Sequence, residues 1–259
     1  MDTKYWGPGG WVLLHTISFA KQDEKDLTAF FNSLPYVLPC KYCRASLSEY
    51  VTQHPFNVKS PGKWLYTIHN CVNNKLRGQH LKVEPNPPFS KVEALYKERL
   101  GASCTKTNFD GWEFLFSIVE NHPLSRLSTS GKPIQNSPEP GALKSPLEKN
   151  KWNLLTGEER MPQFLKFWET LPKVLPFPEW KNIWSSCTTD WSTRKSSLKS
   201  LWSIRCKMER ELELLNSTDF YTLCKELQKH RSGCAKSKRA ITCRKKRKVT
   251  SSTKVKNSS

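Results

Sequence analysis

Two cysteines, Cys40 and Cys43, are separated by two residues and follow Pro39 directly. Thiols at this spacing can close a small disulfide, open it again and pass the electron pair to an acceptor. The residues from Lys41 to Val51 are predicted to form a helix, which places the pair at a helix N-terminus. The partial positive charge at that end favours the thiolate, the reactive form of cysteine. The pattern therefore favours a redox-active cysteine pair.

Zinc binding is the alternative use of the same pair. A tetrahedral zinc site needs two further cysteine or histidine ligands, and no second close cysteine pair follows at the usual distance. We therefore predict no metal at Cys40 and Cys43. Near the C-terminus, Cys224, Cys234 and Cys243 could shuttle electrons to the core, or bind zinc together with His230, although their spacing is irregular.

The elements that would position the pair are helical. Apolar residues recur at helical spacing, and no segment shows the alternation of a strand, so we predict an all-α fold and exclude a thioredoxin-like sheet. A turn at Trp6–Gly10 should place Pro8 at the first position of the first helix, and Pro35 should stop the second. Further helices are expected at Lys41–Val51, after Ser60–Pro61, at Phe89–Leu100 and between Phe109 and Val119.

Polar residues accompany two of these predicted helices. Trp11 and His15 lie four residues apart and share a helix face; alone, they favour a packed helix with a partly buried histidine. His69, Asn70 and Asn73 form a strip beside an apolar helix face. Histidine and asparagine are poor helix formers, so several of them in one helix indicate either a ligand contact or a solvated helix edge.

Composition divides the chain into four parts. Residues 1–121 hold the cysteine pair, and residues 122–150 are rich in Pro, Ser and Gly, as a linker would be. Residues 151–230 contain six of the ten tryptophans and should form a second, mostly helical domain, whose tryptophans form its core or a partner surface. Residues 231–259 read as a basic disordered tail.

The formal charge of +19 is concentrated in that tail. Twelve of the 42 lysines and arginines lie in residues 229–256, which contain no acid, so the first 228 residues carry only +7. The cluster Arg244–Val249 is typical of nuclear-import signals and of nucleic-acid contacts. A rival hypothesis is therefore a nucleic-acid-binding protein, or a zinc-stabilised interaction protein, that uses the basic, cysteine-containing tail.

Membrane insertion and secretion are not expected. No apolar run approaches 18 residues, and the N-terminus lacks a basic-then-apolar signal segment. Nine cysteines are too few for a disulfide-dense secreted scaffold. Structural disulfides are rare in the cytosol, so a cysteine pair in such a chain favours catalysis.

Three motifs, taken in this order within about a hundred residues, resemble the Erv/ALR family of flavin-dependent sulfhydryl oxidases. They are Trp6-Gly7-Pro8-x-x-Trp11-x-x-x-His15, Pro39-Cys40-x-x-Cys43 and His69-Asn70-x-Val72-Asn73-x-Lys75-Leu76. The resemblance covers roughly Lys4 to Cys104 and implies a bundle of four or five helices, usually a dimer, that holds FAD at its mouth.

The resemblance also implies roles for residues. The catalytic pair would be Cys40, which exchanges disulfides with substrate dithiols, and Cys43, which faces the isoalloxazine. Electrons would pass from protein dithiols through this pair to FAD and then to O2, giving H2O2. The implied cofactor-binding residues are Gly7, Trp11, His15, His69, Asn70, Asn73, Lys75, Leu76 and Tyr96, the last standing where the family commonly has Trp.

The sequence departs from the cellular members of that family. Cys104 could be half of their second cysteine pair, but Ser90 stands near the place of its partner, and Cys71 lies inside the His-Asn motif. The short core and the missing pair resemble members encoded by large DNA viruses. This resemblance implies a cytoplasmic or virion-associated protein, with Arg244–Val249 as a possible nuclear-import signal.

Overall fold

The computed structural model describes residues 1–143 and 145–231, and within them it contains helices and no strand. The predicted all-α fold is confirmed. Its helices are α1 (Thr3–Phe19), α2 (Glu24–Val37), α3 (Lys41–Gln53), α4 (Pro61–Arg77), α5 (Phe89–Gly101), η1 (Ser103–Thr107), α6 (Trp112–Glu120), η2 (Pro140–Ala142), α7 (Pro146–Lys151), α8 (Gly157–Val174), α9 (Pro178–Ser185), α10 (Arg194–Leu212) and α11 (Phe220–Arg231). The predictions for the tail, including Cys234, Cys243 and Arg244–Val249, lie outside the described residues.

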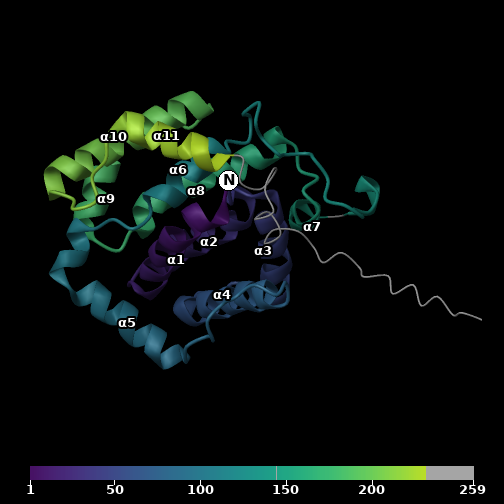
Figure 1. Ribbon diagram of the computed structural model, residues 1–259, viewed down its shortest axis with the longest axis horizontal. Coiled ribbons are helices and arrows are strands. Elements are labelled where there is room, and N and C mark those ends of the chain that lie inside the picture. Colours follow the sequence, from purple (N-terminus) through teal and green to yellow (C-terminus); the bar gives the residue numbers. More distant parts are fainter. Residues whose placement is uncertain (144, 232–259) are drawn as a thin grey trace, which may run out of the picture.

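Helices α1 and α2 occupy the centre of the molecule, with α4 and α5 along one side and α9, α10 and α11 along the other (Figure 1). Helix α3 packs against α2, α4 and α7, and α1 packs against α4, α5 and α6. The cysteine-bearing helix α3 therefore contacts its neighbours α2 and α4 and also α7, a helix from much later in the chain.

The first helix begins earlier than the sequence suggested, so the predicted turn at Trp6–Gly10 is wrong. Asp2 is the N-cap of α1, and its side chain accepts a hydrogen bond from the backbone N–H of Lys4. Pro8 therefore lies inside the helix, in its second turn. Gly10 sits where α1 meets α6, since a Cβ there would lie 3.0 Å from the Phe114 ring.

Helix α2 also runs past its predicted end. Pro35 does not stop it, and the helix continues to Val37. The carbonyls at this end point at buried donors from later in the chain: Asn150 Nδ2 donates to Pro35 O at 2.9 Å, and Arg160 Nε and Nη2 donate to Tyr36 O at 3.0 and 2.6 Å. These partners satisfy carbonyls that a helix end otherwise leaves open.

One hydrophobic core includes residues from both halves of the chain. Its most extensive helix contact joins α2 to α8, where the rings of Phe30 and Phe167 lie 5.2 Å apart. Trp168, Trp180 and Trp184 are buried in this core. The division of the chain at residues 121 and 150 stays a prediction, but the helices on either side of it are packed together.

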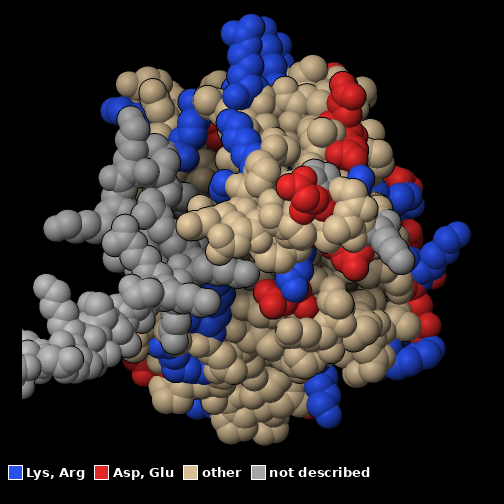
Figure 2. Space-filling model, turned by 90° about the vertical axis from the view of Figure 1, so that its right-hand side faces the viewer, with Lys and Arg blue, Asp and Glu red and all other residues tan. Residues whose placement is uncertain are grey.

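No helix in the described part of the chain is both long and apolar enough to cross a bilayer. On the face drawn in Figure 2, acidic and basic side chains are interspersed among uncharged surface. The described surface visible in this view therefore shows no continuous basic area of the kind that attracts a phosphate backbone.

Candidate active site

The cysteine pair lies at the start of α3, as the sequence predicted. Cys40 is the N-cap residue of this helix, and Cys43 lies in its first turn. The side chain of Cys40 is 4% exposed, whereas that of Cys43 is partly buried. The backbone N–H of Arg44 donates to Cys40 O at 2.9 Å and closes the first helical turn around the pair.

Cys43 lines a cavity of about 560 Å³ that lies between α1, α3 and α4. Pockets of this size are typical of small-molecule and cofactor sites. Six of the residues predicted to bind a cofactor line the same cavity: Gly7, Trp11, His69, Asn73, Lys75 and Leu76. The structure thus brings two of the sequence motifs and the second cysteine of the third around one space.

An aromatic stack forms one part of the cavity wall. The ring of Trp11 lies parallel to that of His69, with centroids 3.9 Å apart. Behind it, His15 Nε2 and His69 Nδ1 form a hydrogen bond of 3.1 Å. Burial lowers the pKa of His15 to about 3, with a smaller contribution from His69, and burial lowers the pKa of His69 to about 4. Both rings are therefore neutral at pH 7.

Four of the predicted site residues do not line the cavity. His15 and Tyr96 stand behind it, with their rings stacked 4.9 Å apart. Asn70 lies on α4 and Cys40 at the start of α3, and neither belongs to the cavity wall. Their predicted roles stay predictions. His15 contacts the wall residues Trp11 and His69, and Tyr96 contacts His15.

Other wall residues were missed in the sequence. Ser46, Leu47 and Tyr50 follow Cys43 by three, four and seven residues and line the cavity with it. Helical spacing puts these positions on one face, so the sequence carried a signal that could have found them. Leu81 and Val83, which follow α4, also contribute, but no periodicity marks a loop in this way.

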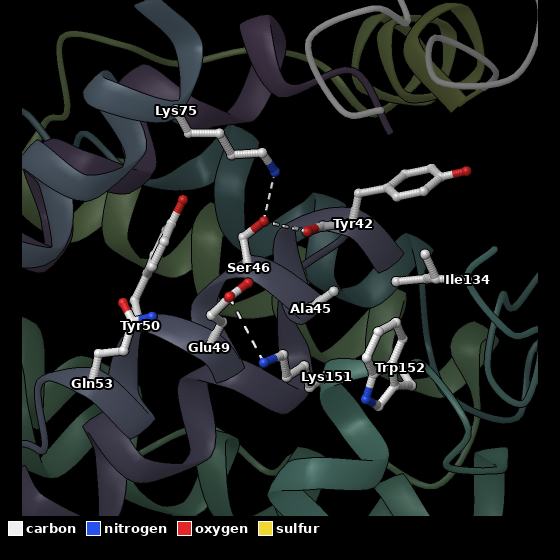
Figure 3. A pocket seen from close by; sticks show the side chains of 10 residues that line it. All are labelled: Tyr42, Ala45, Ser46, Glu49, Tyr50, Gln53, Lys75, Ile134, Lys151 and Trp152. Atoms are coloured by element: carbon white, nitrogen blue, oxygen red, sulfur yellow. Dashed lines mark hydrogen bonds and ion pairs between the residues drawn. The ribbon is translucent and has the colours of Figure 1, made fainter. Parts of the chain in front are cut away.

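A second cavity of about 260 Å³ adjoins the first and shares Tyr42, Ser46, Tyr50 and Lys75 with it. Lys75 Nζ donates to Ser46 Oγ at 2.6 Å, between the two spaces (Figure 3). Another part of the wall of the second cavity comes from later in the chain, from Ile134, Lys151 and Trp152. Lys151 Nζ lies 3.7 Å from Glu49 Oε1 on α3. Helix α3 therefore faces both cavities.

The remaining cysteines of the described chain lie apart from this wall. Cys71 is a partly buried residue of α4 whose pKa is raised by burial, and Cys104 is exposed in η1. Within residues 1–143 and 145–231, no group of three or more His, Cys, Asp or Glu side chains is arranged to hold a metal ion.

The fold and the site together are an all-helical bundle with a cysteine pair at a helix N-terminus, whose second cysteine lines an aromatic-walled cavity. Residues 8–95 match the model of the Erv1 / Alr family. The resemblance that the sequence motifs predicted is thereby confirmed for this segment. No solved structure gave a significant match to the chain.

Named relatives agree with the family match. Over 85 residues the chain is 31% identical to a mimivirus protein named as a probable FAD-linked sulfhydryl oxidase, and 28% identical to the mitochondrial FAD-linked sulfhydryl oxidase ERV1 of Saccharomyces cerevisiae. These alignments cover 28% and 29% of this chain, and 59% and 45% of the relatives. A protein of Invertebrate iridescent virus 3, provisionally named in the same way, is 26% identical over 42% of this chain and 80% of its own length. The chain thus spans about half the length of the first two relatives.

Proposed function

We propose that this protein is an FAD-dependent sulfhydryl oxidase that forms disulfides in protein substrates and reduces O2 to H2O2. One observation carries the proposal. Cys43 lines the same cavity as Trp11 and His69, which stack on each other. A sulfur that can release an electron pair is thus beside a space of cofactor size with an aromatic wall.

The residues present fit a flavin dinucleotide. The cavity wall is largely apolar and offers aromatic faces for stacking, together with the polar side chains of Asn73 and Lys75. Trp6 Nε1, which belongs to a residue of the cavity wall, is buried and has no hydrogen-bond partner among the described residues, as expected where a polar ligand supplies the missing partner. Trp11, His69, Asn73 and Lys75 would hold FAD. When bound, FAD supplies an acceptor for the electron pair of the cysteines, and O2 can reoxidise that acceptor.

The chemistry of the cysteine pair follows from thiol exchange. A substrate thiolate attacks Cys40 Sγ of the Cys40–Cys43 disulfide; the new S–S bond forms as the old one breaks, and Cys43 leaves as a thiolate. The second substrate thiolate then displaces Cys40, so that the substrate is oxidised to a disulfide and the pair is reduced by two electrons. Because Cys40 is 4% exposed, this attack requires the residues that cover it to move.

The residues around the cavity affect this reaction through the position of the cysteines, the polarity of the wall and its charge. Cys43 lines the cavity while Cys40 does not, which supports the proposal that Cys40 exchanges disulfides with the substrate and that Cys43 donates the electrons. Leu14, Leu65 and Ile68 line the wall and keep its dielectric constant low. The neutral rings of His15 and His69 add aromatic and polar surface without a net charge. The homodimer implied by the family resemblance, and a nucleic-acid contact by the tail, stay predictions.

Oxygen consumption by the purified full chain tests the proposal. With dithiothreitol, the wild type should consume oxygen and release an equal amount of hydrogen peroxide. Cys43→Ser should lose this turnover because the electron pair has no exit, and the matched variant Cys104→Ser should retain it, since Cys104 is exposed in η1. A wild type that consumes no oxygen, or a Cys43→Ser variant as active as wild type, would contradict the proposal.

A further inference from the structure

Arg44 follows Cys43 directly and is completely buried, with 0% exposure. Its Nη1 donates to Leu38 O at 2.9 Å, on the turn that leads into Cys40. Its Nη2 donates to Thr129 Oγ1 at 2.9 Å and to Asn153 Oδ1 at 2.7 Å. Every one of these partners is neutral. The guanidinium is thus held beneath the cysteine turn by hydrogen bonds alone.

Burying a guanidinium without a carboxylate partner costs free energy, because hydrogen bonds to neutral groups offset only part of the lost hydration. Among the described residues, no Asp or Glu is bonded to the Arg44 guanidinium, whose partners are Leu38 O, Thr129 Oγ1 and Asn153 Oδ1. Burial lowers the pKa of Arg44 to about 10, and the thiolate forms of Cys40 and Cys43 are the groups that oppose this shift. The groups that can balance the buried positive charge are therefore the two sulfurs.

Two residues from far along the chain keep Arg44 in this position. Asn153 adopts a left-handed backbone conformation with φ of 57°, which asparagine tolerates better than most residues. Its Nδ2 donates to Thr129 O at 2.6 Å and to Lys132 O at 2.8 Å, so its Oδ1 is fixed towards Arg44. Thr129 and Asn153 lie outside residues 8–95, the segment that matches the family.

We propose that Arg44 is a positioning residue that stabilises the thiolate form of the Cys40–Cys43 pair, and that Thr129 and Asn153 hold it there. The later segment of the chain thereby sets the acidity of the cysteine pair and its tendency to accept electrons. A stabilised thiolate favours the reduced pair and makes its disulfide a stronger oxidant. The consequence for turnover rests on the proposed oxidase function, whereas the effect on thiol acidity does not.

Other titratable groups on α3 and on neighbouring segments bear on the same measurement. They are Lys41, Tyr42 and Tyr50 on α3, His69 and Lys75 on α4, Lys132 in the loop before α7, and Arg160 on α8. Lys41, Lys75, Lys132 and Arg160 are cationic and act in the same direction as Arg44. Of these, Arg160 is itself buried and donates to Tyr36 O and to Ser130 Oγ. Arg44 is the cation bonded to the turn that carries Cys40.

Alkylation of the reduced full chain tests this assignment without using its activity. The rate of reaction with iodoacetamide is measured against pH, and mass spectrometry of peptides assigns it to Cys40 and Cys43. In Arg44→Met, the thiol pKa of the pair should rise by about one unit or more, since a nearby opposite charge shifts a pKa by one to three units. Arg44→Lys should restore part of the shift. An unchanged thiol pKa in a folded Arg44→Met variant would overturn the proposal.

A second variant decides the question if Arg44→Met fails to fold. Asn153→Asp keeps an oxygen towards Arg44 but makes it a carboxylate, which competes with the thiolates for the positive charge of Arg44. The thiol pKa should therefore be higher than in the wild type, as in Arg44→Met. Asn150→Ala is the matched control. Asn150 donates to Pro35 O and Ser48 Oγ in the same junction but does not touch Arg44, so this variant should lower stability and leave the thiol pKa unchanged. A thiol pKa that does not move in Asn153→Asp, or moves equally in Asn150→Ala, would overturn the assignment.

The two proposals fail separately. A chain that shows the Arg44-dependent thiol pKa but consumes no oxygen with dithiothreitol would remove the oxidase function and leave the role of Arg44 in place. A chain that consumes oxygen but keeps the same thiol pKa in all folded variants would remove the role of Arg44 alone.

Discussion

His15 Nε2 lies 3.1 Å from His69 Nδ1, and this hydrogen bond joins α1 to α4 behind the cavity wall. Because burial lowers the pKa of both rings, to about 3 and about 4, one neutral imidazole donates and the other accepts. Protonation of both rings would place two positive charges side by side and remove the acceptor. The hydrogen bond between His15 and His69 therefore requires that at least one ring is neutral, as both are at pH 7.

The first prediction is that stability falls as the pH drops from 7 to 5. The unfolded chain takes up protons on these histidines near pH 6.5, whereas folded His15 and His69 do not until about pH 3 and 4. The unfolded state then binds more protons, so each histidine lowers the free energy of unfolding by about 2 kcal/mol between pH 7 and pH 5, mostly below pH 6.5. Urea unfolding at pH 7, 6 and 5 measures the effect.

A double variant, His15→Asn with His69→Asn, is the control for this dependence and should flatten most of it. His122 will contribute a remainder, because its pKa is also lowered by burial. Equal stability of the wild type at pH 7 and pH 5 would show that these rings are accessible to protons in the folded state.

The second prediction concerns the aromatic wall. Trp11→Ala removes the ring that stacks on His69 at 3.9 Å, and we expect affinity for FAD to fall about tenfold, from the loss of stacking worth roughly 1 kcal/mol and of buried ring surface. The absorbance of flavin relative to protein in purified samples, and a titration with added FAD, measure this. Trp202→Ala is the control, because Trp202 lies on α10 against Phe220 and outside the cavity. Equal flavin affinity in both variants would remove Trp11 from the binding site.

The third prediction tests the contact between the two halves of the chain. Phe167 is buried on α8 against Phe30 of α2. Phe167→Ala should lower the free energy of unfolding by about 3–5 kcal/mol, since it leaves a cavity in a packed core. Leu165→Ala, on the same helix but 43% exposed, should change it by about 0.5 kcal/mol or less. Similar losses in both variants would mean that α8 does not share a core with α2.

Much of the cavity could be predicted because its residues lie in local motifs. The helical spacing of Trp11 and His15, and of His69 and Asn73, marks shared faces, and the cysteine pair marks a helix start. The hydrogen bonds from Arg44 to Thr129 and Asn153 could not be predicted in this way. Asn153 lies 109 residues from Arg44, in the predicted second domain, and Thr129 lies in the predicted linker. Sequence spacing carries no signal for contacts that form only when distant segments pack together.

The predicted boundaries of α1 and α2 were wrong for a related reason. Proline rules placed a boundary at Pro8 and another at Pro35, and both residues lie inside helices. Local propensity favours a break at proline, but tertiary partners such as Asn150 and Arg160 satisfy the carbonyls near Pro35. At Pro8, the cap at Asp2 had already started the helix. Packing therefore outweighed the local preference.

The most direct test of the account is the absorbance of flavin in the purified full chain when dithiothreitol is added without oxygen. The proposal predicts a yellow protein whose flavin absorbance bleaches in the wild type and stays in Cys43→Ser, because Cys43 is the sulfur on the cavity wall. A colourless protein that takes up no added FAD would contradict the account, as would a Cys43→Ser variant that bleaches as fast as the wild type.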